Sequence, residues 1–455
     1  MKSRWIGLLV FLSFISISFS LASRFVPGLS GPSAWGDDDD GLPFPKKATF
    51  TTLITTPRAI EGLTGDNYRN LYTGGSGTPP CPVWQINLNN PKLVEVGFVK
   101  PASGNCGFSG IAFDEAGNLY VADGGAGTIY FFNPSVKNPP TAAVFASGVP
   151  GTNGLAFDRR GNLWTGDGTT GQGRVWKITS PGANCTASPA VNCTEVFRIQ
   201  PMSNEVNLVN GVGGVGRDIR TLPPGVITIT PTSRNATVQT TSPPCPNPPG
   251  PPCVLGSQAL VANGLAFNRK GDLFVIDDAR GALWKIEFNR RGELKSPTGC
   301  DTTFTPNTLC LSNIFVAHPI IEGGDGIALD KDENIWVDAN ERNAVALVTK
   351  DGKVFEVFRN PVNLPLPPPV VFGAGLRNAG DQSVGNNHIL EFPTSPFLTG
   401  KLFCTSMSDG DRRDNSPRAA GEINAGATQN GTNQLGKISC MDQELKIPGL
   451  PLPID

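Results

Sequence analysis

Short apolar runs with period-2 alternation recur along this chain, and the runs follow one order. A polar residue and Gly open an aliphatic run, a tight polar turn follows, and a second run is rich in aromatic and β-branched residues. Runs of this kind, bounded by Gly, Asn and Asp, predict β-strands. The layout occurs five times, in Glu61–Tyr72, Ser109–Asp123, Asn153–Trp164, Asn263–Phe274 and Asp325–Asp338.

The copies continue with further runs. Third strands are predicted over Thr128–Phe132, Arg174–Ile178 and Ala282–Ile286, and fourth strands over Ala142–Ala146, Glu195–Ile199 and Lys353–Phe358. Self-similarity with a period of roughly 40 to 50 residues is typical of propellers and solenoids, because each unit buries its apolar face only against its neighbours. Four strands in each unit make one propeller blade.

A sixth, diverged blade is needed to fill the C-terminal part. Its first three strands are predicted over Asn387–Phe392, Gly400–Thr405 and Gly436–Cys440. The predicted fold class is therefore all-β, a six-bladed β-propeller with four-stranded antiparallel blades around a central channel. One domain over residues 50–448, followed by a tail at 449–455, fits the 455 residues because a propeller core grows blade by blade.

The N-terminus has the layout of a secretory signal. Lys2 and Arg4 precede the apolar run Ile6–Phe19, and small residues follow at 20–22. This predicts a signal peptide over 1–22, a linker over 23–49, and a secreted protein, either periplasmic or extracellular. An uncleaved membrane anchor is the alternative, and no other stretch of the sequence is long and apolar enough to cross a bilayer.

Cysteine usage and charge narrow the class of protein. Ten cysteines fit an exported chain. Proximity suggests five pairs, Cys81 with Cys106, Cys185 with Cys193, Cys245 with Cys253, Cys300 with Cys310 and Cys404 with Cys440, although sequence does not determine connectivity. The absence of Cys-x-x-Cys weakens zinc and iron–sulfur interpretations. A net charge of −2 argues against a nucleic-acid partner.

A Pro-rich segment at 201–258 interrupts the repeat between blades three and four. Long insertions of this kind map to surface loops on one face of a propeller. The segment is predicted to be either a passive, disulfide-tied loop or a loop near a ligand site.

The polar residue that opens each innermost strand is the candidate for chemistry, because all six blades present that position to the central channel. The six positions are Glu61, Ser109, Asn153, Asn263, Asp325 and, with Phe392 aligned to Phe267, His388. Two carboxylates and two amide oxygens suit Ca²⁺, with Mg²⁺ or Mn²⁺ as alternatives, whereas Zn²⁺ prefers more nitrogen or sulfur. The competing interpretation is that Asn-Gly and Asp-Gly are turn dipeptides. Glu is a poor turn residue, so Glu61 favours the metal site.

The order Glu-Gly, Asn-Gly-Leu, Asn-Gly-Leu and Asp-Gly-Ile on successive blades resembles the gluconolactonase, senescence-marker-protein and luciferin-regenerating-enzyme superfamily, with paraoxonases as relatives. The resemblance implies a catalytic divalent cation held by Glu61, Asn263 and Asp325, with Asn153 as a fourth ligand or a substrate contact, and a His near the metal, which His388 matches. Ser109 is a further candidate substrate contact. Gly151 stands where the superfamily places a substrate-binding Arg, and Leu63-Thr-Gly follows Glu61, so sugar-lactone specificity is not implied.

The leading hypothesis is a secreted, divalent-metal-dependent hydrolase of a lactone or related ester. The cation would act as a Lewis acid on the carbonyl oxygen, with Asp325 or His388 as general base for the attacking water. His318 is predicted to be structural. The expected partner is a small-molecule substrate, with no nucleic acid, no membrane after signal cleavage, and a monomeric state. The alternative is a non-catalytic, NHL-like propeller that binds a protein, glycan or small ligand, because blade repeats specify a scaffold and not a task.

Overall fold

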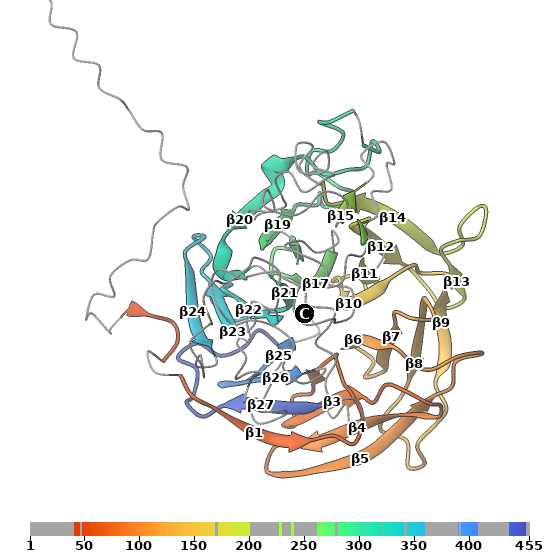
Figure 1. Cartoon of the computed structure of the whole chain (residues 1–455). Helices are drawn as coiled ribbons and strands as arrows, with labels where there is room; N and C mark the ends of the chain where they lie inside the picture. Colours follow the sequence, from red (N-terminus) through yellow and green to blue (C-terminus); the bar gives the residue numbers. More distant parts are fainter. Residues whose placement is uncertain are drawn as a thin grey trace, which may run out of the picture.

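The computed structural model describes residues 41–45, 48–168, 172–200, 262–277, 281–302, 304–321, 323–340, 344–359, 390, 393–407 and 436–451, with two short strands at 227–229 and 238–240. These residues form six blades around a central axis (Figure 1). The six-bladed β-propeller predicted from the sequence is confirmed. Among the described residues, no helix has the length and apolar character needed to span a membrane.

The first three blades follow one another along the chain, each with its strands in order from the axis outward. Blade 1 consists of β2 (Thr64–Gly65), β3 (Asn70–Gly74), β4 (Cys81–Asn87) and β5 (Asn90–Val99). Blade 2 consists of β6 (Phe108–Phe113), β7 (Leu119–Asp123), β8 (Thr128–Phe132) and β9 (Ala143–Ser147), with β13 (Ala183–Asn184) added in parallel at its edge. Blade 3 consists of β10 (Thr152–Phe157), β11 (Leu163–Asp167), β12 (Arg174–Ile178) and β14 (Cys193–Arg198).

The other three blades follow the insertion, of which the structure describes only the hairpin β15 (Ile227–Ile229) and β16 (Val238–Thr240). Blade 4 consists of β17 (Ala262–Phe267), β18 (Leu273–Asp277), β19 (Ala282–Ile286) and β20 (Ile314–Ala317). Blade 5 consists of β21 (Gly324–Leu329), β22 (Ile335–Ala339), β23 (Ala344–Val348) and β24 (Val354–Arg359). Blade 6 consists of β25 (Pro393–Thr399), β26 (Leu402–Met407), β27 (Lys437–Met441) and β1 (Phe50–Thr55).

Blade 6 closes the ring with strands from both ends of the propeller. The N-terminal strand β1 pairs antiparallel with β27 and supplies the outermost strand. The sequence-based assignment of the innermost strand to Asn387–Phe392 is wrong, because that strand is β25. Pro393 and Pro396 made this stretch a poor strand candidate by pattern. The innermost strand has a partner on one side only, however, so a missing N–H is tolerated.

The tight turn after the innermost strand is built around one carboxylate in blades 1, 2, 3 and 5, and around the Asn268 amide in blade 4. In blade 3, Asp158 Oδ1 accepts the backbone N–H groups of Arg160 at 2.9 Å and Asn162 at 3.0 Å, and its Oδ2 accepts Trp164 Nε1 at 2.9 Å. Asp66, Asp114 and Asp330 make the corresponding bonds in blades 1, 2 and 5. The turn is therefore fixed by its first residue, its Asn and an aromatic side chain of the second strand, and its tip side chains are not needed for its shape.

Aromatic side chains of the second strands pack across the blade boundaries. Trp164 contacts the ring of Phe267 with centroids 5.8 Å apart, and Trp336 contacts Phe403 at 5.1 Å. Both tryptophans are buried. Contacts of this kind bury the face that each blade cannot cover alone, which is what makes the ring a single body.

Four of the five predicted disulfides are confirmed, namely Cys81–Cys106, Cys185–Cys193, Cys300–Cys310 and Cys404–Cys440. Cys245 and Cys253 lie outside the described residues, as do the predicted signal peptide and most of the predicted linker. The four confirmed bonds are compatible with an extracellular or periplasmic location.

Candidate metal centre

The candidate residues lie in irregular positions of the innermost strands. The antiparallel register shifts between Phe108 and Ile111 in β6, and equivalent shifts occur in β10, β17 and β21. The residues inside these bulges are Ser109, Asn153, Asn263 and Asp325, each followed by Gly. A β-bulge re-aims a side chain and is common beside active sites. The Asn-Gly and Asp-Gly pairs therefore lie within strands, and the turn interpretation is wrong for them.

The glycines that follow these residues allow neighbouring strands to approach closely. A Cβ built on Gly154 would lie 2.6 Å from the carbonyl oxygen of Asn263, and one on Gly264 would lie 2.5 Å from that of Asp325. Gly62, Gly110 and Gly326 make the same approach to the carbonyl oxygens of Ser109, Asn153 and Thr394. Each glycine thus contacts the candidate residue of the next blade, and the candidate positions form one ring around the axis.

Thr394 completes this ring in blade 6. It lies at the register shift of β25, the position equivalent to Asp325 in β21, and its hydroxyl donates a hydrogen bond to the Glu61 carbonyl oxygen at 2.8 Å. Thr394, not His388, therefore occupies the sixth position, because β25 begins later than the strand predicted from the sequence. His388 itself lies outside the described residues. We call Glu61, Ser109, Asn153, Asn263, Asp325 and Thr394 the polar ring.

Two members of the polar ring meet across the channel. The Asn153 amide donates a hydrogen bond to the Glu61 carboxylate, although the two residues belong to blades separated by blade 2. Gly168 makes room for Asn153, since a Cβ there would lie 2.2 Å from Asn153 Nδ2. Burial raises the pKa of the Glu61 carboxyl to about 7, and the hydrogen bond from Asn153 acts in the opposite direction. A carboxylate in this position lacks the solvation that keeps an ordinary Glu ionised.

Asp325 is held by a residue that sequence analysis missed. The amide of Asn340, just after β22, donates a hydrogen bond to Asp325 Oδ2 at 3.0 Å. Asn340 Oδ1 is buried and has no hydrogen-bond partner among the described residues. The equivalent position in blade 3 is Gly168. The backbone N–H of Asn340 bonds the carbonyl oxygen of Gly323, and the backbone N–H of Gly168 bonds that of Gly151. Both acceptors directly precede the innermost strand of their own blade. The sequence signal that could have identified Asn340 is that blade 5 has Asn at a position where blade 3 has Gly168.

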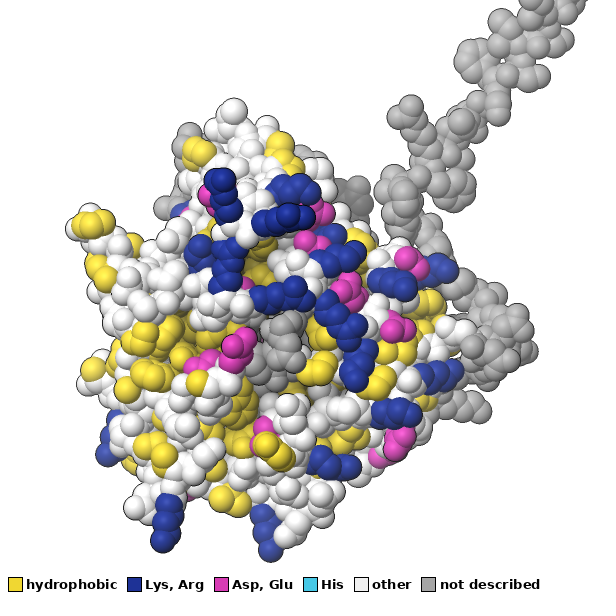
Figure 2. Space-filling view, turned by 180° about the vertical axis from the view of Figure 1, so that it is seen from behind, with side chains coloured by type: hydrophobic (Ala, Val, Ile, Leu, Met, Phe, Trp, Pro, Cys, Tyr) yellow, Lys and Arg dark blue, Asp and Glu magenta, His cyan; other side chains and the backbone are white. Residues whose placement is uncertain are grey.

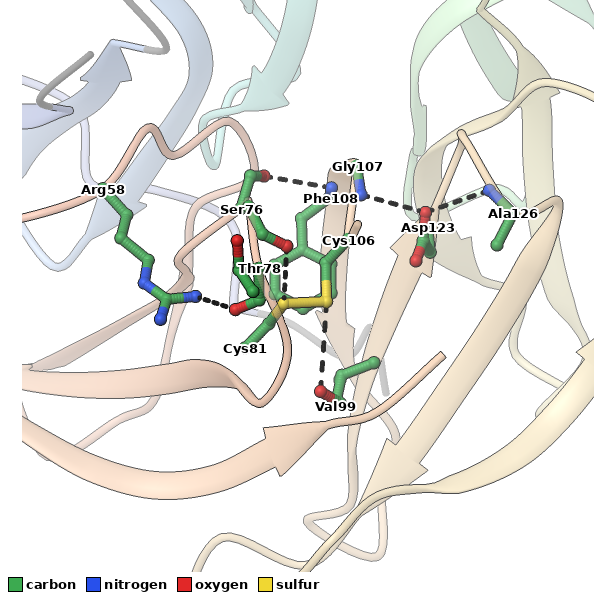
Figure 3. The surroundings of a disulfide bond; sticks show 11 residues. Arg58, Ser76, Thr78, Cys81, Val99, Cys106, Gly107, Phe108, Asp123 and Ala126 are labelled. Atoms are coloured by element: carbon green, nitrogen blue, oxygen red, sulfur yellow. Dashed lines mark hydrogen bonds between the residues drawn. A yellow bond between two sulfur atoms is a disulfide. The ribbon is translucent and has the colours of Figure 1, made fainter. Parts of the chain in front are cut away.

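Ser109 is held in place by backbone and disulfide constraints. Its hydroxyl donates to the Thr152 carbonyl oxygen at 2.9 Å and thereby joins blades 2 and 3. Before Ser109, the backbone N–H of Phe108 bonds Ser76 Oγ at 3.1 Å, and the Cys81–Cys106 disulfide ties the same segment to blade 1 (Figure 3). The hydroxyl proton is thus committed to the scaffold, and only the lone pairs of Ser109 remain for a ligand.

Beyond the polar ring the channel is apolar. A cavity of about 100 Å³ lies between the six innermost strands, and its walls include Leu63, Ile111, Leu155, Leu265, Ile327 and Pro396, each two residues beyond a member of the ring. Leu450 also lines it, and its backbone N–H bonds the Leu329 carbonyl oxygen at 2.9 Å. The segment assigned to a C-terminal tail therefore begins inside the propeller. An apolar space of this kind offers water no polar partners.

The donor set fits a hard divalent cation. Glu61 and Asp325 supply carboxylates, Asn153 and Asn263 supply amide oxygens, and the buried Asn340 Oδ1 lies beside Asp325. Oxygen donors of this mixture match Ca²⁺ and also Mg²⁺ or Mn²⁺. In the described part of the chain no three His, Cys, Asp or Glu side chains cluster as metal ligands, so a cation here depends on the amide oxygens.

Comparison with known proteins agrees with the resemblance noted in the sequence. Residues 253–378 match the family model described as the SMP-30/Gluconolactonase/LRE-like region, which confirms the resemblance to that superfamily within these blades. The matched segment includes Asn263 and Asp325. No curated protein sequence matches this chain.

Solved structures with a similar arrangement include several enzymes and a calcium-binding protein. Regucalcin from Agrobacterium tumefaciens has 13% identity and a TM-score of 0.47, over 90% of this chain and 97% of its own. Virginiamycin B lyase from Staphylococcus aureus has 11% identity and a TM-score of 0.39, over 86% and 98%. A luciferin-regenerating enzyme has 10% identity and a TM-score of 0.42, over 89% and 97%. The assignment of the fold rests on the strand topology of this chain itself.

Proposed function

We propose that this protein is a secreted, divalent-cation-dependent hydrolase of a lactone or related ester, with the cation bound in the polar ring. The observation that supports the proposal most directly is the hydrogen bond from Asn153 to Glu61, because it brings side chains from blades 1 and 3 together inside the channel. A partly buried carboxylate with a raised pKa beside amide oxygens is the arrangement expected of a cation site without its ion.

Glu61, Asn153, Asn263 and Asp325 would hold the ion. When bound, the cation supplies Lewis-acid polarisation of the substrate carbonyl oxygen. Ca²⁺ is the first candidate, because a site of mixed carboxylate and amide oxygens suits it, and Mg²⁺ or Mn²⁺ are the alternatives. The name of regucalcin, a calcium-binding protein with this kind of fold, agrees with that choice.

The chain itself supplies the proton-transfer groups and their orientation. Asp325 is the candidate general base for the attacking water, with Asn340 fixing one of its carboxylate oxygens through the 3.0 Å hydrogen bond. His388 stays a second candidate base by sequence. Asn153 would either ligate the ion or orient the substrate, and Ser109 has lone pairs left for a substrate hydroxyl. The apolar cavity beyond the ring limits the entry of water from the end of the channel that carries the tight turns.

The test combines cation binding with turnover. The full-length secreted protein is treated with a chelator, titrated with Ca²⁺, Mg²⁺ and Mn²⁺ by calorimetry, and assayed on aldonolactones, alkyl lactones and aryl esters. We expect one cation per chain, chelator-sensitive turnover, and loss of both on Glu61→Gln and Asp325→Asn. The matched controls Glu115→Gln and Asp332→Asn, in exposed turns, should leave both unchanged. Cation binding without turnover of any ester would overturn the hydrolase assignment and favour the non-catalytic propeller.

A further inference from the structure

Basic side chains gather at the end of the propeller opposite the polar ring. The innermost strands run from the ring toward the tight turns, so the tips of these turns form the far face. The exposed tip residues are Asn67 and Tyr68 in blade 1, Glu115 and Ala116 in blade 2, Arg159 and Arg160 in blade 3, Arg269 and Lys270 in blade 4, and Lys331 and Asp332 in blade 5. Lys and Arg side chains concentrate on part of this face in Figure 2.

A third basic turn joins those of blades 3 and 4. Asn289 Oδ1 accepts the backbone N–H of Arg291 at 2.8 Å and that of Glu293 at 3.1 Å, so Arg290 and Arg291 lie at the tip. The side chain of Arg159 donates to the Arg269 carbonyl oxygen, and that of Arg160 donates to the carbonyl oxygens of Arg290 and Arg291. The three tips are therefore adjacent. We call Arg159, Arg160, Arg269, Lys270, Arg290 and Arg291 the basic face.

The fold does not require these charges. The turn shape comes from the Asp or Asn at its start, and the same turn is formed in blade 2 with Glu115 and Ala116 at its tip. Basic residues at the corresponding positions of blades 3 and 4 are consequently a property of the surface and not of the turn.

Nearby carboxylates do not neutralise the basic face. Lys285 lies 3.1 Å from Asp272 and 3.5 Å from Glu287, and Lys295 lies 2.8 Å from Glu287. Asp158 is occupied by the N–H groups of its own turn. None of the six side chains of the basic face has an ion-pair partner within the described ranges. Cations gathered in this way raise the local potential and attract an anionic partner.

The surface between the turns is concave. A cavity of about 200 Å³ is lined by Arg159, Arg160, Lys270 and Arg290, with the partly buried ring of Phe288 in its wall. Arg binds carboxylate and sulfate groups through two parallel N–H donors. An aromatic wall beside such donors suits a sugar ring that carries an acidic group.

We propose that the basic face binds an acidic polysaccharide, a chain of sugars carrying carboxylate or sulfate groups. The exposed large apolar side chains of the described residues, such as Tyr68 and Val94, lie outside these three turns, which disfavours insertion into a lipid surface. The four disulfides indicate an oxidising compartment, where glycans are the abundant polyanions. This binding is independent of the proposed hydrolase, because the polar ring lies at the other end of the strands.

The test uses the full-length secreted protein and measures binding to polygalacturonate and to heparin in 150 mM salt, with neutral dextran, phosphatidylserine vesicles and duplex DNA as comparisons. The double variant Arg159→Glu, Arg160→Ala places in the blade 3 turn the residue types that blade 2 has at its tip, Glu115 and Ala116. It should weaken polysaccharide binding at least tenfold. Lys270→Ala, whose side chain makes no hydrogen bond among the described residues, should weaken it about threefold. Lys92→Ala with Lys137→Glu changes the net charge equally, at exposed positions of blades 1 and 2, and should have no effect.

Binding should also fall with added salt, because the contacts are ionic. Carboxylated and sulfated glycans are separated by the two polysaccharide arms, and binding to either supports the proposal. Equal loss in the charge control, binding to the vesicles or DNA alone, or no retention of the wild-type protein by either polysaccharide would overturn it. Ester turnover by the Arg159→Glu, Arg160→Ala variant is expected to match the wild type, so failure of one proposal leaves the other standing.

Discussion

The amide of Asn340 donates a hydrogen bond to the carboxylate of Asp325 at 3.0 Å, and the other amide atom, Oδ1, is buried without a partner among the described residues. The first bond fixes the orientation of a candidate ligand. The unpartnered oxygen indicates that a further group, such as a bound ligand, completes the surroundings of Asp325, because a buried polar atom without a partner costs free energy.

Asn340→Gly should weaken cation binding. Gly is the residue that blade 3 has at the equivalent position, Gly168, so the backbone tolerates it. Loss of a hydrogen bond that orients a ligand typically costs 10–100-fold in metal affinity, and we expect a roughly tenfold higher Kd for Ca²⁺. Calorimetric titration measures it without reference to activity. The control Asn138→Gly, in an exposed loop, should keep the wild-type Kd. An unchanged Kd in Asn340→Gly would show that Asn340 does not position Asp325.

Gly264→Ala should destabilise the propeller. A Cβ at this position would lie 2.5 Å from the Asp325 carbonyl oxygen and 2.8 Å from the Ile327 nitrogen, and both are backbone atoms that cannot turn aside. We expect a loss of about 2 kcal/mol or more in the free energy of unfolding, as for other overpacked sites. The control Gly125→Ala meets only ordinary contacts, the nearest at 3.5 Å, and should change stability by less than about 1 kcal/mol. Urea unfolding compares them, and equal effects would contradict the close-approach argument.

Proton binding at Glu61 should compete with the cation. The pKa of Glu61 is raised to about 7 in the cation-free protein, so below pH 7 the carboxyl group must lose its proton before it can ligate. The apparent affinity for Ca²⁺ should therefore fall almost tenfold for each pH unit below about 6 and level off above about 8. Titrations at pH 5.5, 6.5 and 8 measure the slope. Glu61→Gln should bind more weakly and lose this slope, whereas the exposed Glu115→Gln should retain it. A flat wild-type profile would exclude Glu61 as a ligand that titrates in this range.

The repeat pattern alone predicted most of the fold. The third strands over Thr128–Phe132, Arg174–Ile178 and Ala282–Ile286 coincide with β8, β12 and β19, because each is a short period-2 run between turn residues. The sequence placed Glu61, Ser109, Asn153, Asn263 and Asp325 at corresponding positions, and the glycine contacts bring those positions together.

The errors lie where local pattern and tertiary context disagree. Pro393 and Pro396 hid the innermost strand of blade 6, because Pro is disfavoured in strands except at an unpaired edge, and the edge status of β25 is a property of the whole ring. The misplaced strand put His388 in the sixth position instead of Thr394. Asn340 was missed because its partner Asp325 lies on a neighbouring strand, so no periodicity joins the two.

A second buried carboxylate should govern the pH dependence of stability. Asp338 in β22 accepts a hydrogen bond from the Thr405 hydroxyl at 2.5 Å, and its Oδ1 has no partner among the described residues. Burial raises the pKa of Asp338 well above its usual range, although the Thr405 hydrogen bond acts in the opposite direction. The folded protein therefore holds a proton here at pH values where the unfolded chain has released it.

The sign of the effect follows from this difference. An Asp with a raised folded-state pKa stabilises the fold below its unfolded pKa, and this contribution is lost as the pH rises toward the folded value. The wild-type protein should consequently lose stability relative to Asp338→Asn as the pH rises from 4.5 to 8, because Asn keeps an oxygen for Thr405 and does not ionise. Urea unfolding with chelator present, at pH 4.5, 6 and 8, measures the difference. Thr405→Val, which removes the hydroxyl but keeps the titrating group, should preserve the wild-type trend. Parallel pH curves for the wild type and Asp338→Asn would mean that Asp338 ionises in the folded chain as it does in the unfolded one.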